Sequence, residues 1–430
     1  MNESFYSCQK LTAVSVLSVV SLFGCQSRDF NPNQNAGFSQ ANTTDSWMPR
    51  LKTALNPPCT GTLSGEKSPF ECVPSSEFAE VESAKKIAIA QVRTKRTKET
   101  SPQALTRRDA HARPHGCVKG TFVVGNNVPA EMQKGPFKTS AANFNVWSRF
   151  SAAGVKPDAK DDTKTDIQGF ALKIIGVPGK KLIDEGTQES NGFDLLLANV
   201  PFFLAKDVKE YNEQLSLNSP DIDIFTKGRI LFTVLPRLNR AIGMSKTQNP
   251  FSDIYSSVST YQIEQNMVNY RAVPCANQTH MAGPEGATKF RTAMQLSMTQ
   301  GNGACFELEA RKALTPSYLM AEDVTKTWEE HITTALEKVP EAKGNSVFEK
   351  TIGPWVSLGQ ISFPVQTFES EGQMNFCEAM SFNPWRTLPE MRPLGGLNRA
   401  RKSVYKAVFD TRKADNSWKD IPEPTGTESF

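Results

Sequence analysis

The chain contains only four histidines, and two of them, His111 and His115, lie four residues apart within the stretch Arg107–Val124. Arg108 precedes His111 by three residues, and a run typical of a β-strand, Gly120–Val124, follows shortly after. An imidazole on a loop that leads into a strand is well placed to exchange protons near neutral pH. We therefore take His111 as a candidate general acid–base residue, with a histidine satisfied by the local backbone as the alternative. His115 is expected only to cap the loop.

A tyrosine near the C-terminus is the second candidate, because Tyr405 follows Arg401 by four residues. On a helix this spacing places both side chains on one face, within contact. A free phenol has a pKa near 10, so a tyrosine becomes a phenolate ligand at neutral pH only beside a metal and a cation. Arg412 lies seven residues beyond Tyr405, on the same face. A tyrosine packed in an amphipathic helix is the alternative.

Four further segments each combine polar residues with an aromatic residue. They are Trp147–Ser151, Asp166–Lys173, Asp194–Asp207 and Ser381–Trp385. Together with the His111 and Tyr405 segments, and in the same order along the chain, they resemble the haem catalase superfamily. The resemblance is closer to the short catalase-related branch, which includes peroxidases and hydroperoxide-converting enzymes. It covers most of the chain, from Arg107 to Arg412.

The resemblance implies a peroxide-binding pocket on one face of haem b. His111 would take a proton from one peroxide oxygen and return it to the leaving oxygen. Ser151 would hold this histidine in the correct tautomer. Asn199 matches, one position late, the asparagine that polarises the peroxide, and Phe203 matches a phenylalanine of the same pocket.

The resemblance also implies which residues hold the haem. Tyr405 would bind the iron, with Arg401 favouring its phenolate form. Arginines suit the haem propionates, because a guanidinium presents a fixed fork of donors to a carboxylate. The matching arginines are Arg108, Arg149 and Arg412.

Three positions depart from the catalase pattern. Ala198 stands where catalases carry the catalytic amide, Ala110 is smaller than the usual valine, and no Pro-Asp-Thr follows Tyr405. These departures weaken rapid dismutation of hydrogen peroxide more than they weaken haem binding. We therefore expect a peroxidase or weak catalase that reduces hydrogen peroxide or organic hydroperoxides through a ferryl intermediate. The alternatives are a hydroperoxide isomerase or lyase of the allene oxide synthase type, and a non-enzymatic haem-binding lipoprotein.

The elements that must position these residues are mainly strands. The resemblance implies a mainly β, α+β fold, a catalase-like antiparallel β-barrel with flanking helices. Apolar or alternating runs bounded by turn residues predict strands at Gly120–Val124, Gly169–Gly176, Phe193–Asn199, Arg229–Leu235, Tyr261–Ala272 and Trp355–Phe363. Apolar residues at helical spacing predict helices over Ser76–Lys95, Tyr318–Glu337 and Asn398–Lys413.

The N-terminus carries an apolar run of signal-peptide length, Leu11–Phe23, followed by Gly24 and Cys25. This resembles a bacterial lipoprotein signal with lipid on Cys25, and an ordinary cleaved signal or a short anchor helix is the alternative. Gln26, in place of Asp, favours the outer membrane, so we expect a lipid-anchored protein of the bacterial cell envelope, on the periplasmic side. The predicted divisions are a signal peptide (1–24), a flexible tether (25–75), a haem-binding domain (76–415) and a C-terminal tail (416–430).

Charge and cysteine content bear on the partners and the compartment. The formal net charge of +4 is too small to indicate a nucleic-acid-binding protein. The expected partners are a peroxide substrate and, through the lipid, a membrane, and the oligomeric state stays open. Six cysteines follow Cys25, which allows fifteen pairings. Cys59 and Cys72 flank a loop rich in Gly, Ser and Pro, so we expect this pair first.

Overall fold

The computed structural model describes residues 46–63, 70–98, 105–153, 166–183, 191–217, 222–342, 346–418 and 424–430. The predicted signal peptide, the predicted lipidation site at Cys25 and the first part of the predicted tether lie outside the described residues.

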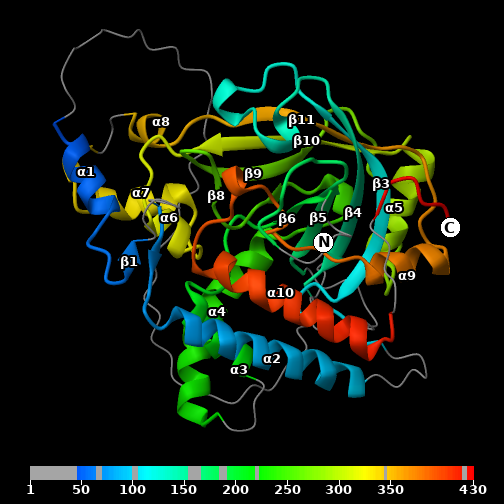
Figure 1. The fold of residues 1–430 in the computed structure, drawn as a ribbon, viewed down its shortest axis with the longest axis horizontal. Coiled ribbons are helices and arrows are strands. Elements are labelled where there is room, and N and C mark those ends of the chain that lie inside the picture. The colour runs from blue at the N-terminus through cyan, green and yellow to red at the C-terminus, as the bar shows by residue number, and fades with distance from the viewer. Residues whose placement is uncertain are drawn as a thin grey trace, which may run out of the picture. The chain divides into compact units, whose positions relative to one another are not determined.

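Within the described residues, eight antiparallel strands close into a barrel (Figure 1). The ring closes because β10 pairs with both β9 and β11, and β11 pairs with β3. The predicted antiparallel barrel with flanking helices is therefore confirmed. Around the barrel the strands are β3 (Arg113–Val124), β4 (Asn143–Ala152), β5 (Gln168–Ile174), β6 (Phe193–Ala198), β7 (Tyr255–Ser256), β9 (Asn266–Pro274), β10 (Ala304–Lys312) and β11 (Val356–Phe363), and β8 (Tyr261–Ile263) extends the sheet beside β9.

Aromatic side chains fill the interior of the barrel. Phe150 and Phe170 stack with 4.6 Å between ring centroids, and Tyr255 and Phe306 pack against both of them. All four side chains are fully buried. Along β10 every second residue is buried, as expected for a strand with one face toward a core.

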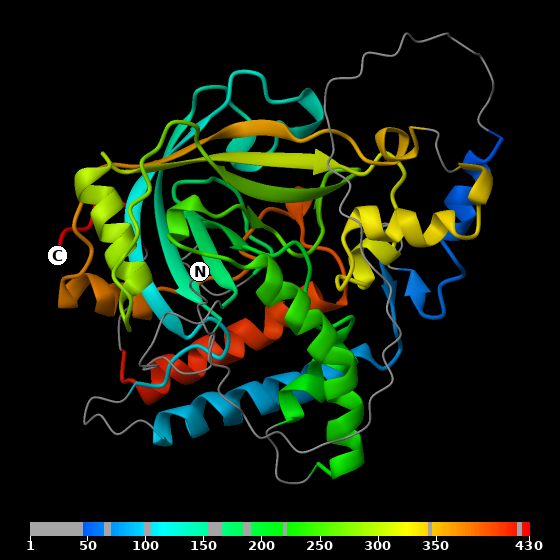
Figure 2. The ribbon, with the colours of Figure 1, turned by 180° about the vertical axis from the view of Figure 1, so that it is seen from behind.

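Helices cover the outside of the barrel, and α10 (Gly396–Asp415) lies between the barrel and α2 (Glu77–Thr97) in Figures 1 and 2. These two helices pack through the small and β-branched residues Ala84, Ala88, Val404 and Val408. The other helices are α1 (Met48–Leu55), α3 (Val208–Ser216), α4 (Ile224–Met244), α5 (Lys289–Gln300), α6 (Leu319–Glu322), α7 (Trp328–Leu336), α8 (Val347–Thr351) and α9 (Glu371–Ala379), and the short strands β1 (Thr62–Leu63) and β2 (Cys72–Val73) pair with each other.

Most predicted elements are confirmed, and three differ. The predicted strand Arg229–Leu235 is wrong, because these residues form the middle of α4, whose N-cap Asp223 accepts hydrogen bonds from Phe225 N and Thr226 N. The predicted strand Tyr261–Ala272 is split into β8 and β9 by a turn at Glu264, where φ is 48°. The predicted helix Tyr318–Glu337 is split into α6 and α7, since Thr327 begins a new helix with a capping box.

The folded unit is longer than predicted at both ends, and it spans Ser46–Phe430. The predicted tether boundary at residue 75 is too late, because Leu51 and Leu55 of α1 are buried in a core shared with α7. The predicted tail also packs on the barrel: Trp147 Nε1 donates to Glu428 Oε2 at 2.7 Å, and Phe430 lies 5.0 Å from Phe376 between ring centroids.

Disulfides join elements within this unit. The predicted Cys59–Cys72 disulfide is confirmed, and the remaining pairs are Cys117–Cys377 and Cys275–Cys305. Of the helices in the described ranges, none combines the length and the apolar character that crossing a membrane requires.

Candidate functional site

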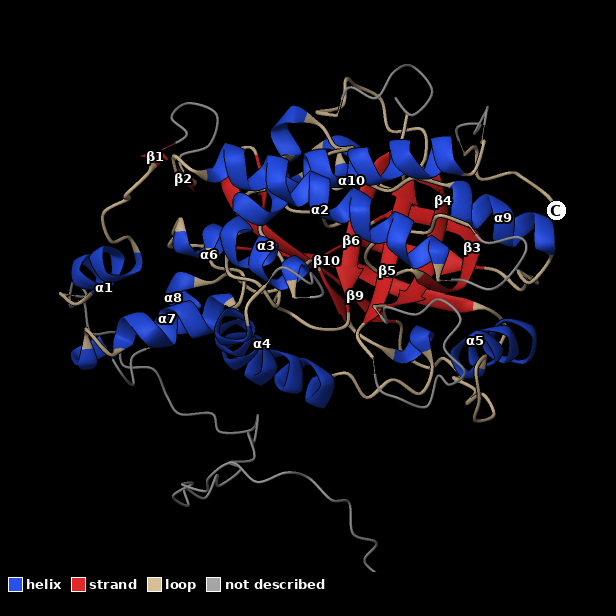
Figure 3. Ribbon diagram, turned by 90° about the horizontal axis from the view of Figure 1, so that it is seen from below, coloured by secondary structure: helices blue, strands red, loops and turns tan. Residues whose placement is uncertain are grey.

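A cavity of about 360 Å³ lies where the barrel meets α10. Figure 3, which views the molecule from the side of this helix, shows α10 and α2 in front of strands β3 to β6. The lining is mostly apolar, with side chains from the loop before β3, from β4, β5 and β6, and from α3 and α10. It includes Arg108, His111, Arg149, Ser151, Phe203, Arg401, Tyr405 and Arg412. One cavity therefore brings together eight of the side chains that the sequence singled out.

Tyr405 and Arg401 form one wall of the cavity from adjacent turns of α10. Arg401 Nε donates a hydrogen bond of 3.3 Å to the Tyr405 hydroxyl, and its guanidinium lies 5.1 Å from the centroid of the ring. Arg401 Nη1 is held in turn by Asn398 Oδ1 at 3.0 Å. Burial alone would lower the pKa of Arg401, but the phenol oxygens of Tyr405 and Tyr261 raise it above its usual value. Tyr405 therefore has a permanent cation at its oxygen.

The first turn of α10 is fixed by carboxylates from the N-terminal part of the chain and from α6. Glu71 Oε1 accepts from Gly395 N, and Glu322 Oε2 accepts from Gly396 N, both at 2.8 Å. Arg399 joins these two carboxylates to Glu77. Carboxylates are favourable at a helix N-terminus, where unpaired N–H groups and the helix dipole present positive charge. This network sets the position of Tyr405 along the cavity.

His111 faces the same cavity from the loop before β3, in a left-handed conformation with φ of 54°. A non-glycine residue adopts this conformation at a cost of about 1–2 kcal/mol. Its carbonyl accepts a hydrogen bond of 2.9 Å from Arg149 Nη2, which holds the loop in place. Burial, with a smaller contribution from the charge of Arg149, lowers the pKa of His111 to about 4. The imidazole is therefore neutral at neutral pH.

Gly169 of β5 leaves the space that the His111 ring occupies. A Cβ on Gly169 would lie 2.6 Å from His111 Nδ1 and 3.1 Å from Ser151 Oγ. His111 Nδ1 is buried and has no hydrogen-bond partner among the described residues. Ser151 thus lies beside His111, as the resemblance implies, but no hydrogen bond joins its hydroxyl to the ring here. In the sequence Gly169 is one residue of the segment Asp166–Lys173, and no local pattern marks it as the neighbour of His111.

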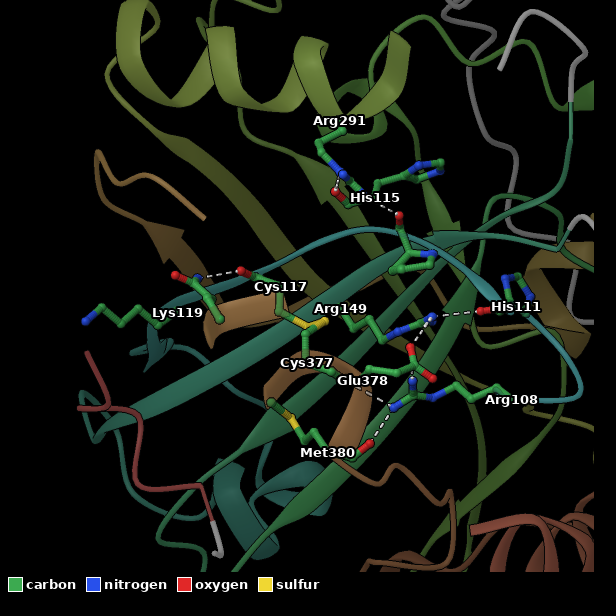
Figure 4. Close-up of a disulfide and its surroundings, with 12 residues drawn as sticks. Arg108, His111, His115, Cys117, Lys119, Arg149, Arg291, Cys377, Glu378 and Met380 are labelled. Atoms are coloured by element: carbon green, nitrogen blue, oxygen red, sulfur yellow. Dashed lines mark hydrogen bonds and ion pairs between the residues drawn. A yellow bond between two sulfur atoms is a disulfide. The ribbon is translucent and has the colours of Figure 1, made fainter. Parts of the chain in front are cut away.

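Three arginines meet one carboxylate at the other end of the cavity. Glu378 of α9 lies 3.0 Å from Arg108, 2.9 Å from Arg412 and 3.9 Å from Arg149, measured between oxygen and nitrogen. Figure 4 shows Glu378 with Arg108 and Arg149. Burial would raise the pKa of Glu378, but the arginines lower it below its usual value. Burial, with the charge of Arg108, lowers the pKa of Arg412 to about 9. The four side chains carry three positive charges and one negative charge, an excess that favours a bound anion.

Glu378 was not found by sequence reasoning, because nothing in its local sequence marks it. The disulfide between Cys117 of β3 and Cys377 places it, as Figure 4 shows. Arg108 also donates to the carbonyl of Met380, so the end of α9 and the loop before β3 hold each other.

Asn199 is the predicted catalytic residue that is not among the described residues lining the cavity. Its Nδ2 donates to Ser245 Oγ at 2.8 Å, Thr247 Oγ1 at 3.1 Å and Asp253 Oδ2 at 2.9 Å, and its Oδ1 accepts from Gln168 N at 2.8 Å. Among the described residues that line the cavity, its neighbour Ala198 is present and Asn199 is not. The amide has a structural role because these four bonds use its donors and acceptor.

His115 also differs from its predicted loop-capping role. Its ring is buried, and Nε2 lies 2.8 Å from Gln168 Oε1. Burial, opposed by the bond to Gln168, lowers the pKa of His115 to about 3. His115 therefore joins β3 to β5 as a neutral side chain.

This chain is similar to known proteins in structure, and no similarity in sequence was found. No family model matches the chain, and no curated protein matches it by sequence. A bacterial catalase superposes with a TM-score of 0.52 at 15% identity over 86% of this chain. Catalase A from Saccharomyces cerevisiae and a fungal catalase give TM-scores of 0.51 and 0.50, each at 16% identity over 76% of this chain.

The fold is that of the catalases. The chain spans 66%, 65% and 64% of the length of these three catalases, slightly less than two thirds. In this catalase-like fold, the site residues come from both sides of one cavity: His111 with Ser151 and Gly169 on the barrel side, and Tyr405 with Arg401 on α10.

Proposed function

We propose that this protein binds haem b in the cavity between barrel and α10 and processes peroxides as a peroxidase or weak catalase. The observation that carries the proposal is that His111 and the Tyr405–Arg401 pair line the same cavity. The catalase fold adds support at the level of architecture, since fold alone does not establish an activity.

The residues present fit this cofactor. Tyr405 would be the iron ligand, and the Arg401 guanidinium, whose Nε lies 3.3 Å from its hydroxyl, would place a positive charge beside the ligating oxygen. Arg108, Arg149 and Arg412, which share the carboxylate of Glu378 within the described residues, would bind the two propionates. The apolar lining, which includes Phe203, suits a flat and largely apolar ring. Bound haem would supply the redox-active iron.

His111 would move the proton. Because Nδ1 is buried against Gly169 and Ser151, Nε2 is the nitrogen that remains for a ligand in the cavity. With a pKa of about 4, the ring is a free base at neutral pH and can accept a peroxide proton at Nε2 and return it to the leaving oxygen. Arg149 fixes the position of the His111 backbone, and so of its ring, by donating a hydrogen bond to the His111 carbonyl.

Slow dismutation of hydrogen peroxide follows from the position of the amide. Ala198 lines the cavity and Asn199 is used elsewhere, so no amide from this segment would polarise hydrogen peroxide. The same observation supports the second candidate, a hydroperoxide isomerase or lyase of the allene oxide synthase type, which takes apolar hydroperoxides.

The experiment is reconstitution of the purified chain with haem, followed by absorption spectroscopy and turnover with hydrogen peroxide and with an organic hydroperoxide. Consumption of either peroxide that requires a reductant indicates a peroxidase. Oxygen release from hydrogen peroxide, measured with an oxygen electrode, indicates a catalase. Conversion of the organic hydroperoxide with neither reductant nor oxygen release would favour the isomerase or lyase. Stoichiometric haem without turnover would leave a haem-binding lipoprotein, and a chain that binds no haem would reject the proposal.

We also propose that lipid on Cys25 anchors the chain in the bacterial cell envelope, on the periplasmic side of the outer membrane. A diacyl anchor is stable because each buried methylene contributes about 0.8 kcal/mol. Mass spectrometry of the N-terminal peptide should show acyl groups on the wild type and none on Cys25→Ser. A wild-type peptide without acyl mass would reject the anchor.

A further inference from the structure

Helix α4 presents an unusually apolar outer face to solvent. Ile224 is 78% exposed, Phe225 86% and Phe232 82%. Among the large apolar side chains of the described residues, only Phe78 on α2 is comparably exposed. Less exposed residues of the same helix, Leu231, Leu235, Ile242 and Met244, add to the apolar surface.

The exposed residues form one stripe. Ile224, Leu231, Leu235 and Ile242 recur at spacings of seven, four and seven, which places them on one face of a helix, with Phe225 and Phe232 along its margin. The opposite face holds Ile230, Val234 and Ala241, which are buried against the rest of the molecule. The stripe is open: a Cβ on Gly228, which belongs to the same face, would have no atom within 4 Å.

Basic side chains flank the stripe, and the helix contains no acidic residue. Its cations are Lys227, Arg229, Arg237 and Arg240; Arg237 pairs with Glu210 and Arg240 with Glu330, so Lys227 and Arg229 are the two at the margin of the stripe. Arg229 is strongly exposed, and it pairs with Glu213 at 3.1 Å. An exposed pair of this kind is worth little and is easily exchanged for another anion. An apolar stripe with cations at its margin is the pattern of a helix that lies in a membrane interface.

We propose that the outer face of α4 docks the folded unit on a phospholipid bilayer containing anionic lipid. Ile224, Phe225 and Phe232 would enter the boundary between headgroups and acyl chains, and Lys227 and Arg229 would meet the phosphates. The helix lies along the surface in this arrangement.

The charge of α4 favours a bilayer over two other possible occupants of this face. A second copy would bring Lys227 and Arg229 of one α4 toward the same two cations of the other across an isologous interface, and Ile224–Met244 contains no acidic residue to pair with them. The apolar run Leu11–Phe23 of this chain contains no carboxylate either. A bilayer with anionic lipid offers both an apolar layer and phosphates, and it is the occupant that complements both features.

The inner face of α4 backs the apolar wall of the cavity. Ala241 packs in one cluster with Ala198, Val200 and Phe202, and the Arg240 guanidinium lies 3.9 Å from the centroid of the Phe202 ring. Ala198, Val200 and Phe202 line the cavity. Docking would therefore bring this wall close to the bilayer, which suits a substrate dissolved in the membrane. The docking itself does not depend on haem or on turnover.

The test uses the full chain with Cys8→Ser and Cys25→Ser, so that neither a lipid nor a cysteine outside the disulfides is present. A polarity-sensitive fluorophore is attached at Leu235→Cys, and at Phe78→Cys in the matched control. With vesicles of phosphatidylcholine and phosphatidylglycerol, we expect a blue shift and quenching by lipid-borne nitroxide at position 235 and neither change at position 78. If position 235 gives no shift, or if both positions shift equally, the proposal is overturned.

A second measurement compares partition of unlabelled chains onto the same vesicles. Phe225→Ser with Phe232→Ser should lower the partition coefficient at least about tenfold, because two aromatic rings lose their apolar burial. Phe78→Ser should leave the coefficient within about twofold of the parent by the same reasoning. Circular dichroism and thermal melting of each variant show whether the fold is retained.

Two results would assign the face to another occupant and overturn the proposal. One is a dimer in light scattering that Phe225→Ser with Phe232→Ser dissociates, while vesicle binding is unchanged. The other is faster proteolysis within residues 11–23 in that double variant, again with unchanged vesicle binding.

Discussion

A substitution at Tyr405 should reduce haem binding without affecting folding. Tyr405→Phe keeps the ring beside Arg401 and removes only the oxygen that would bind iron. We expect haem affinity to fall at least about tenfold, as loss of even a supporting group at a metal site does. Haem absorbance per mole of purified protein measures the effect. Tyr318→Phe, at a tyrosine that donates to Pro57 O, is the control. Full haem content with an unchanged spectrum in Tyr405→Phe would remove the ligand assignment.

His111 is expected to affect rate and not haem content. His111→Ala should slow the reaction with hydrogen peroxide and with an organic hydroperoxide by about 10²- to 10⁴-fold, the usual contribution of a positioned acid–base group. Haem binding should stay near the wild-type level, because Tyr405 lies on the other wall of the cavity. Stopped-flow absorption after mixing with peroxide measures the rate. Equal rates for variant and wild type with both peroxides would show that His111 does not move the proton.

Asn199 should behave as a structural residue. Asn199→Ala removes an amide whose two N–H groups face three acceptors after α4 and whose oxygen accepts from Gln168 N of β5, and we expect a loss of stability of about 1–3 kcal/mol. The rate per haem-loaded molecule should be unchanged. Urea unfolding and single-turnover kinetics on one preparation test both statements. A hundredfold slower reaction with unchanged stability would restore the catalytic role that the sequence suggested.

The local pattern of the sequence was enough to find the residues of the cavity that sit in motifs, such as His111 and the Arg401–Tyr405 pair. It could not find Glu378, because the partners of this carboxylate come from other parts of the chain. It placed Asn199 at the cavity, whereas the side chain bonds to Ser245, Thr247 and Asp253, residues that no local motif connects to it.

At the scale of elements, the barrel was predictable and α4 was not. Strands such as β11 show short apolar runs bounded by turn residues, which is a local signal. The run Ile230–Leu235 has the same composition, but its buried residues Ile230, Val234 and Ala241 follow helical spacing. The exposed face of α4 is also apolar, so the usual contrast between a polar and an apolar side was missing and the helix resembled a strand.

The Cys117–Cys377 disulfide should stabilise both α9 and the arginine cluster. Cys117→Ser with Cys377→Ser opens a loop with a sequence separation of 260 residues. Chain entropy then predicts a loss of about 5 kcal/mol, and less if the denatured chain is compact. Cys59→Ser with Cys72→Ser, with a separation of 13 residues, is the matched control and should cost about 3 kcal/mol. Urea unfolding gives both values, and the reverse order would contradict this account.

At the scale of the whole molecule, acid should destabilise the fold through its buried histidines. The pKa of His115 is about 3 and that of His111 about 4 when folded, against about 6.5 in an unfolded chain. Between these values the unfolded state binds more protons, so stability falls as the pH decreases from about 6.5 toward 3 and does not recover. The two histidines together account for a loss on the order of 8 kcal/mol.

Urea midpoints measured across this pH range test the effect. His115→Gln, which keeps a donor for Gln168, should flatten the dependence because one proton uptake is removed. The prediction is wrong if the wild type gains stability on acidification, or if the variant keeps the full slope.

The pairing of cysteines also sets an order of events when the chain is made. In an exported chain that emerges N-terminus first, Cys59 meets Cys72 as the next cysteine, and the two pair at once. Cys117 then has to stay reduced while Cys275 and Cys305 emerge and pair with each other, because its own partner, Cys377, is the last to arrive. Oxidation in order of appearance would join Cys117 to Cys275 instead. For a chain exported as proposed, thiol–disulfide exchange catalysed by an isomerase would restore the Cys117–Cys377 pair after such an error.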